Sequence, residues 1–204
     1  MTGQNIINAF RLQVDDSTEL SSTEELQLLN DVYLQCASDR TWEIFKTSAT
    51  GTIVNNEITL PADFSYLFTN HNYNGTTTEN TQPVIFVGST YQPYRVVNFS
   101  ERRQYRNASG YAYLDMANNK IVFTQTPTDT SYEFDYVKVP AELTLDTEPV
   151  FPDRFHKKFA YDMAIQDTII QMSDRAAAMA GMNRAESERY MNNMAMWNSK
   201  LQII

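Results

Sequence analysis

The first fifty residues carry the apolar pattern of helices. A spacing of three and four residues, typical of one buried helix face, runs through residues 21–45. The apolar positions are Leu26, Leu29, Tyr33, Cys36 and Ala37. Ser21 followed three residues later by Glu24 predicts a capping box at the start of this helix. A shorter helix is expected over residues 5–14.

The middle of the chain, roughly residues 51–140, changes to the pattern of strands. Residues 132–138 alternate with a period of two, so that aromatic side chains share one face of a strand. Two hairpins are expected, turning at the paired asparagines 55–56 and 118–119. Asparagine suits these turns because it tolerates the positive φ that they require.

Helical periodicity returns in residues 150–204. Pro152 suits the first helical position, where its missing N–H costs nothing, and Asp153 suits the positive end of the helix dipole. Apolar side chains follow at helical spacing: Phe155, Phe159, Met163 and Ile170. A further helix is expected after residue 174, with the late apolar stripe Tyr190, Met194, Trp197 and Leu201. Gly181 weakens this helix locally.

Together these parts predict an α+β fold. The helices at both ends of the chain cannot bury their apolar faces alone, so the economical arrangement packs them against each other. We expect residues 1–50 and 150–204 to form a helical bundle. Residues 51–149 are expected to form an inserted β-rich domain.

Composition and charge exclude several classes of protein. The chain has 204 residues and a net charge of −9, so it gains no overall counterion-release affinity for DNA. An acidic wall still suits a channel through which DNA slides, because it repels phosphate. Cys36 is the single cysteine, which excludes an internal disulfide and suits a small buried apolar side chain. Neither a membrane span nor a signal peptide is expected, which indicates synthesis in a cytoplasm.

The chemically reactive residues form no recognisable active site. His156 lies beside the apolar stripe, and Asp153 with Lys157 is an i, i+4 pair, which favours a solvated first helical turn. His71 lies in a polar loop, a poor place for a rigid metal ligand. Phosphate-binding, dinucleotide, zincin and nucleophile-elbow motifs are all missing from the sequence. We therefore expect no enzyme, no metal and no cofactor.

One basic patch stands out in this acidic chain, formed by Arg102, Arg103 and Arg106 with a tyrosine between them. Three readings stay open. A run this short is usually a solvated loop; a contact with another subunit comes second, and a contact with a DNA backbone comes third.

The C-terminal residues are apolar and rich in the side chains that anchor protein interfaces. Trp197, Leu201, Ile203 and Ile204 would be frayed and wet at a free chain end. They either fold back on the helices of their own chain or insert into a neighbour. Together with Tyr190 and Met194 they form the candidate interface with another subunit or protein.

An ordered series of weak motifs extends over about residues 20–172. It begins with an aromatic corner at the end of a helix, continues with a Leu-Pro-x-Asp-Phe turn after a hairpin, and ends with a closing helix in the PDRFHKKF stretch. The residues that carry it are Trp42, Leu60, Pro61, Asp63, Phe64, Pro152, Phe155 and Phe159. In their order and spacing these motifs resemble those of the head-to-tail adaptor proteins of tailed bacteriophages, including the tubular-tail type.

The resemblance implies a structural protein of the virion neck, made in the cytoplasm of the host bacterium. Copies of the chain would form a ring under the dodecameric portal, extend the DNA channel and offer a platform to a tail, nozzle or stopper protein. The candidate interface at the end of the chain would contact the portal or a neighbouring subunit. Double-stranded DNA would pass through without sequence-specific binding, and no membrane would be involved.

Three rival functions remain at this point. The first is another neck or tail protein, such as a stopper, a tail-tube protein or a nozzle component. The second is a hydrolase or DNA-processing enzyme that uses His156 and nearby acids. The third is a glycan-binding virion protein that uses the tyrosine- and asparagine-rich β region.

Overall fold

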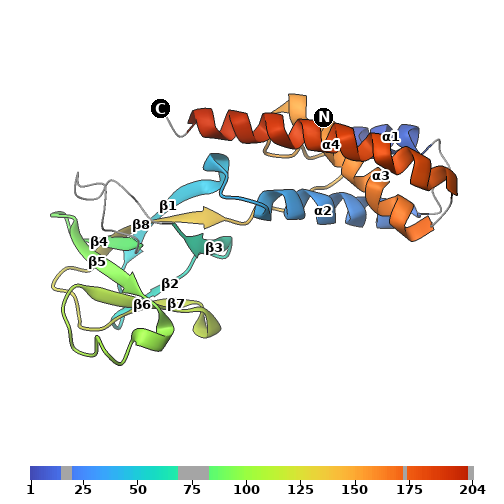
Figure 1. The fold of residues 1–204 in the computed structure, drawn as a ribbon. Coiled ribbons are helices and arrows are strands. Elements are labelled where there is room, and N and C mark those ends of the chain that lie inside the picture. Colours follow the sequence, from blue (N-terminus) through green and yellow to red (C-terminus); the bar gives the residue numbers. More distant parts are fainter. Residues whose placement is uncertain (15–19, 69–82, 172–173, 202–204) are drawn as a thin grey trace. The chain divides into compact units, whose positions relative to one another are not determined.

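The computed structural model describes residues 1–14, 20–68, 83–171 and 174–201 (Figure 1). The α-helices are α1 (Gly3–Gln13), α2 (Ser22–Ser38), α3 (Lys157–Gln171) and α4 (Asp174–Leu201). The strands are β1 (Lys46–Thr52), β2 (Glu57–Thr59), β3 (Phe64–Leu67), β4 (Val84–Val87), β5 (Gln92–Val97), β6 (Tyr111–Asp115), β7 (Lys120–Phe123) and β8 (Ser131–Lys138).

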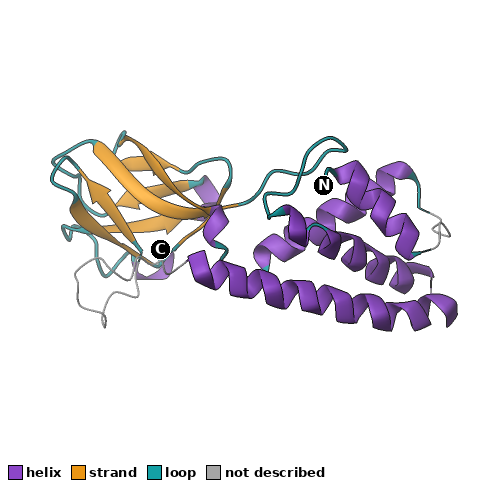
Figure 2. Ribbon diagram, turned by 90° about the horizontal axis from the view of Figure 1, so that it is seen from above, coloured by secondary structure: helices purple, strands orange, loops and turns teal. Residues whose placement is uncertain are grey.

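The chain forms two compact units, and Figure 2 shows the helices in purple and the strands in orange. The helical unit combines Met1–Ile44 with Pro140–Ile204, and the β unit is Phe45–Val139. Whether each unit folds as an independent domain, with the boundaries expected from the sequence, stays a prediction.

In the helical unit, α3 is the helix against which α1, α2 and α4 all pack. The sequence correctly predicts the start of α2, where Ser21 and Glu24 form a complete capping box. The Ser21 side chain accepts a hydrogen bond from the Glu24 backbone N–H, and the Glu24 carboxylate accepts one from the Ser21 backbone N–H. This box satisfies two of the backbone donors that a helix start leaves without partners.

An aromatic cluster joins parts of the helical unit that are far apart in the sequence. The Trp42 ring lies 5.0 Å from that of Phe151 in an edge-on arrangement, and its Nε1 donates to the Cys36 carbonyl oxygen at 2.9 Å. Tyr33 meets Phe151 and Phe159 edge-on, at centroid distances of 6.2 and 5.6 Å. Such edge-to-face pairs are worth about 0.5–1.5 kcal/mol beyond the area they bury. The aromatic corner at Trp42 is thus part of the core of this unit.

One detail of the helices differs from the sequence prediction. Pro152 precedes a 3-10 turn, η4 (Asp153–Phe155), and the α-helix itself starts only at Lys157. In the first turn of α2, the Glu25 carboxylate is buried against Arg11. The Arg11 Nη2 atom lies 2.6 Å from Glu25 Oε2, which compensates the burial of that charge.

The β unit is a single eight-stranded sheet with the order β1-β8-β4-β5-β6-β7-β2, and β3 pairs with β8 beside this path. The first and last strands of the path, β1 and β2, are consecutive in the chain. An isolated bridge between Val54 and Glu57 connects them around the turn. The sheet is therefore barrel-like and nearly closed. The side chains of its core are Ile53, Ile58, Leu60, Ile85, Val87, Tyr94, Val96, Ala112, Ile121, Phe123, Phe134 and Tyr136.

This sheet corrects the fold class expected from the sequence. The sequence predicted an α+β fold with a helical bundle and an inserted β-rich domain. In that prediction the strands form separate hairpins. All eight strands instead belong to one barrel-like sheet, in which β8 pairs with β1, β3 and β4. The physical reason is that pairing between strands distant in sequence leaves no signal in the period of a single strand.

Both turns form at the expected asparagines. Asn55 and Asn56 have φ values of 51° and 68°, and Asn119 has a φ of 55°. These left-handed conformations cost asparagine less than most other residues. Both turns are therefore confirmed, but only the second closes a hairpin, between the paired strands β6 and β7. The strands on either side of residues 55–56 share a single bridge, because β1 pairs with β8 and β2 pairs with β7.

The Leu-Pro-x-Asp-Phe turn has a structural explanation in the contacts of Asp63 with β8. The Tyr136 hydroxyl donates to Asp63 Oδ1 at 2.9 Å, and the Val139 backbone N–H donates to the Asp63 carbonyl oxygen at 2.7 Å. The Phe64 ring stacks on that of Tyr136 at 5.7 Å, and Leu60 is buried in the core of the sheet. The motif thus fixes the end of β8 to the start of β3.

These contacts predict a pH dependence at the alkaline end. Burial, followed by the hydrogen bond and the negative charge of Asp63, raises the pKa of Tyr136 from 10.0 to about 12. Folding therefore favours the neutral phenol, and this contribution is complete below pH 10 and disappears as the pH rises towards 12. In thermal unfolding followed by circular dichroism, the loss of stability between these pH values is expected to be smaller in Tyr136→Phe than in the wild type. Identical pH profiles for the two proteins would contradict the role of this pair.

A glycine in α4 generates a second prediction. A Cβ atom added at Gly181 meets no atom within 4 Å, and glycine in a helix interior costs about 1 kcal/mol relative to alanine. Gly181→Ala is therefore expected to raise the free energy of unfolding by about 1 kcal/mol in chemical denaturation. Gly3→Ala in α1 is the matched control, because its added Cβ overlaps the Thr144 carbonyl oxygen and is expected to destabilise the protein. A destabilised Gly181→Ala variant would show that this prediction is wrong.

Candidate interaction surfaces

Two residues of the candidate interface, Tyr190 and Trp197, line an aromatic groove of about 360 Å³ in the helical unit. The groove combines aromatic, apolar and cationic side chains of α4 and η4: Arg154, Phe155, Tyr190, Asn193, Met196, Trp197 and Lys200. Phe155 is buried and its ring lies 5.8 Å from that of Trp197. The Arg154 guanidinium lies over the Phe155 ring, 4.7 Å from its centroid.

The structure brings together only part of the predicted interface. Tyr190 and Trp197 are half-buried in the aromatic groove, and Leu201 is half-buried at the last turn of α4. Met194 is fully buried in the core of the helical unit, so its side chain is unavailable to a partner. Ile203 and Ile204 lie outside the described residues.

The end of α4 is also fixed internally by Asn198. The Asn198 Oδ1 atom accepts from the Glu43 backbone N–H at 2.7 Å, and its Nδ2 donates to the Thr41 carbonyl oxygen at 3.1 Å. The apolar residues 190–201 therefore fold back on their own unit, which is one of the two alternatives left open by the sequence. They keep one face exposed, where the Met196 side chain is 59% exposed.

The basic patch lies in the β unit, directly after the 3-10 turn η2 (Phe99–Glu101). The Arg102 side chain contacts its own loop. Its Nη1 donates to the Phe99 carbonyl oxygen at 2.7 Å, and its guanidinium lies over the Phe99 ring at 3.7 Å. Arg103 and Arg106 are exposed, and neither forms an ion pair with another residue that the structure describes. The surface available for contact is thus two arginines rather than three.

His156 is buried, not solvated as the sequence suggested, with 1% of its surface exposed. Its Nε2 contacts the Phe151 carbonyl oxygen, and its Nδ1 lies 2.9 Å from the amino group of Met1. Because a carbonyl only accepts, Nε2 carries the proton and Nδ1 accepts from the ammonium group. Asp153 contacts this amino group at 2.7 Å instead of pairing with Lys157. Both nitrogens of the imidazole therefore have structural partners.

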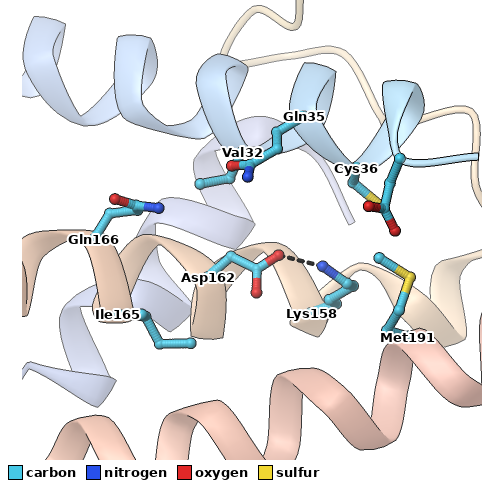
Figure 3. A pocket seen from close by; sticks show the side chains of 9 residues that line it. Val32, Gln35, Cys36, Lys158, Asp162, Ile165, Gln166 and Met191 are labelled. Atoms are coloured by element: carbon cyan, nitrogen blue, oxygen red, sulfur yellow. Dashed lines mark hydrogen bonds and ion pairs between the residues drawn. The ribbon is translucent and has the colours of Figure 1, made fainter.

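A polar crevice of about 170 Å³ lies between α2, α3 and α4, and Figure 3 shows α3 between the other two helices. Lys158 and Asp162 of α3 form an ion pair at its centre, and the Ser187 hydroxyl of α4 donates to the same carboxylate. Cys36 also faces this crevice. Burial, the largest effect, raises the pKa of its thiol to about 12, so it is no thiolate nucleophile.

The sequence missed several of these roles. A helical stripe extended from Trp197 includes Asn193, Met196 and Lys200 at neighbouring positions, so this part of the groove could have been found. The position of Arg154 at the groove could not have been found from the sequence, because Arg154 belongs to another element, η4. Lys158 has no signal of its burial in the sequence, although it is 4% exposed and paired with Asp162 in the crevice.

In the described part of the chain, no group of three or more His, Cys, Asp or Glu side chains is placed to hold a metal ion. No described helix combines the length and apolar character that crossing a membrane requires.

The ion pair in the crevice generates a prediction about stability. Lys158→Met leaves the Asp162 carboxylate in the crevice without its cation, which is expected to lower the free energy of unfolding by about 3 kcal/mol. The double variant Lys158→Met with Asp162→Leu replaces both charges by apolar groups and is expected to recover most of this loss. Chemical denaturation measures both. Equal stability of the single variant and the wild type would contradict a structural role for the pair.

Comparison with known proteins identifies the family of the chain. No curated protein matches the sequence. The family described as SU10 adaptor protein matches residues 1–202, which is nearly the whole chain. This match confirms the resemblance to phage head-to-tail adaptors that the ordered motifs around Trp42, Asp63 and Phe155 indicate. The chain belongs to the SU10 adaptor protein family.

Proposed function

We propose that this protein forms an adaptor ring in the neck of a phage virion, where it joins the portal to the tail and extends the DNA channel. The observation that carries the proposal is the family match over residues 1–202. Its expected partners are the portal protein, a tail, nozzle or stopper protein, and further copies of itself in a dodecameric ring. A ring of identical copies closes through one repeated heterologous contact.

We assign the end of α4 to contacts within the neck, Leu201 to the portal and Tyr190 with Trp197 to a neighbouring copy. Tyr190, Trp197 and Leu201 offer half-buried aromatic and apolar surface, the kind of surface that anchors protein interfaces. Met194 supports this surface from inside the unit. Ile203 and Ile204 follow directly in the sequence and extend the proposed contact.

We propose that charge, rather than a binding site, allows DNA to pass. The net charge of −9 repels phosphate and opposes sticking of double-stranded DNA to the channel wall. Arg103 and Arg106 are assigned to an acidic protein partner or a neighbouring subunit, because two exposed arginines in an acidic chain make a weak phosphate site.

A structural role, without catalysis, is supported by the surroundings of the two reactive side chains. His156 is buried with both ring nitrogens in contact with other groups of the chain, and the thiol of Cys36 has a pKa of about 12. A general base needs a free ring nitrogen and a nucleophile needs a thiolate, and neither is present at these two side chains.

Binding to the portal tests the proposal. The full-length protein mixed with its portal protein is expected to bind as a ring that electron microscopy and native mass spectrometry detect. Leu201→Asp places a charge in the apolar surface at the end of α4 and is expected to weaken portal binding about tenfold. Leu12→Asp is the matched control, because Leu12 is an exposed leucine at the end of α1 and its replacement is expected to leave binding unchanged.

Two results would contradict the proposal in different ways. A wild-type protein that does not bind the portal would remove the adaptor assignment and favour a stopper, tail-tube or nozzle protein. Equal portal binding by Leu201→Asp and the wild type would remove the assignment of the end of α4 alone.

A further inference from the structure

The helical unit carries an acidic segment, residues 142–150, on its surface. It has three carboxylates, those of Glu142, Asp146 and Glu148, and no lysine or arginine. Two apolar side chains are also exposed there, Leu145 at 39% and Val150 at 53%. Exposed apolar side chains between acidic ones are typical of a segment that binds a groove of opposite charge.

Hydrogen bonds to α1 and α2 hold the acidic segment in place, although it contains no helix or strand. The Gly3 N–H donates to the Thr147 carbonyl oxygen at 2.8 Å, and the Gln4 N–H donates to that of Leu145 at 2.9 Å. Asn30 of α2 bonds both backbone groups of Leu143, at 2.6 and 3.1 Å. A segment that is already ordered loses little conformational entropy on binding.

The aromatic groove has the complementary character. Arg154 and Lys200 lie at the groove, and neither forms an ion pair with another described residue. Phe155, Trp197 and the exposed Met196 supply its apolar surface. Two unpaired cations beside aromatic rings favour an acidic ligand with apolar side chains.

The acidic segment and the aromatic groove are formed by different elements of the helical unit. The segment is bonded to α1 and α2, whereas the groove is formed by α4 and η4. Because these hydrogen bonds hold the segment on α1 and α2, it is not free to enter the groove of its own copy. Two different surfaces on one chain are the requirement for a heterologous contact, which repeats around a ring.

We propose that the aromatic groove of one copy binds the acidic segment 142–150 of the neighbouring copy and that this is the repeated contact of the ring. The inference rests on the proposed function, since it names the surfaces through which adjacent adaptor copies meet. The second copy is the occupant favoured by charge, because the chain is acidic overall and this segment adds exposed apolar side chains to three carboxylates.

Charge reversal in the full-length protein tests the contact. The groove variant carries Arg154→Glu and Lys200→Glu, and the segment variant carries Glu142→Lys and Asp146→Lys. Each is expected to weaken self-association about tenfold in sedimentation velocity, free and with portal rings. A mixture of the two variants is expected to assemble like the wild type, because each then offers the charge that the other lacks. Arg184→Glu, on α4 outside the groove, is the matched control and is expected to behave like the wild type.

A cross-link tests the same contact without changing charge. Met196→Cys in one copy and Leu145→Cys in another are expected to form a disulfide under mild oxidation when the two proteins are mixed. The native Cys36 is buried and its thiol has a pKa of about 12, so it does not compete. A mixture that gives no more cross-linked dimer than a control pair of Met182→Cys with Leu145→Cys would overturn the proposed contact.

The outcomes separate this inference from the proposed function. If both charge-reversal variants still form complete rings on the portal, the contact is wrong and the adaptor function stands. If only the groove variant fails while the segment variant assembles normally, the groove binds the portal instead of a second copy. A wild-type protein that binds the portal only as single copies, or not at all, overturns the ring and the contact with it.

Discussion

The helical unit depends on the burial of one aromatic cluster, formed by Tyr33, Trp42, Phe151 and Phe159. Two of these rings precede the β unit in the sequence and two follow it, so their contacts bring the two halves of the helical unit together. Asn198 strengthens the same region through its bonds to Thr41 and Glu43. The positions of α3, η4 and the aromatic groove all follow from this closure.

Local features of the fold could be predicted from the sequence because their causes are local. The capping box at Ser21 and the turns at residues 55–56 and 118–119 each depend on a few neighbouring side chains and on the φ values these allow. The apolar stripe of α4 was visible as well, although periodicity alone did not show that Met194 faces inward while Met196 is exposed.

Features that depend on distant partners could not be predicted. Glu25, His156 and Lys158 look like surface residues in the sequence, and each is buried because Arg11, Phe151 or Asp162 compensates its polar groups. The closure of the eight-stranded sheet also depends on distant partners, since β8 pairs with β1, β3 and β4. Arg154 reaches the aromatic groove only through the packing of η4 beside α4.

Contact rather than catalysis is the role that we propose for this protein. The chain belongs to a family of adaptors, His156 and Cys36 are enclosed, and the described surface carries a groove and a segment of opposite charge. Electron cryomicroscopy of intact virions tests the central claim most directly. We expect density for a closed ring of this chain between the portal and the tail, around the DNA channel. Virions in which the chain occupies another position, or in which the portal contacts the tail without it, would contradict the account.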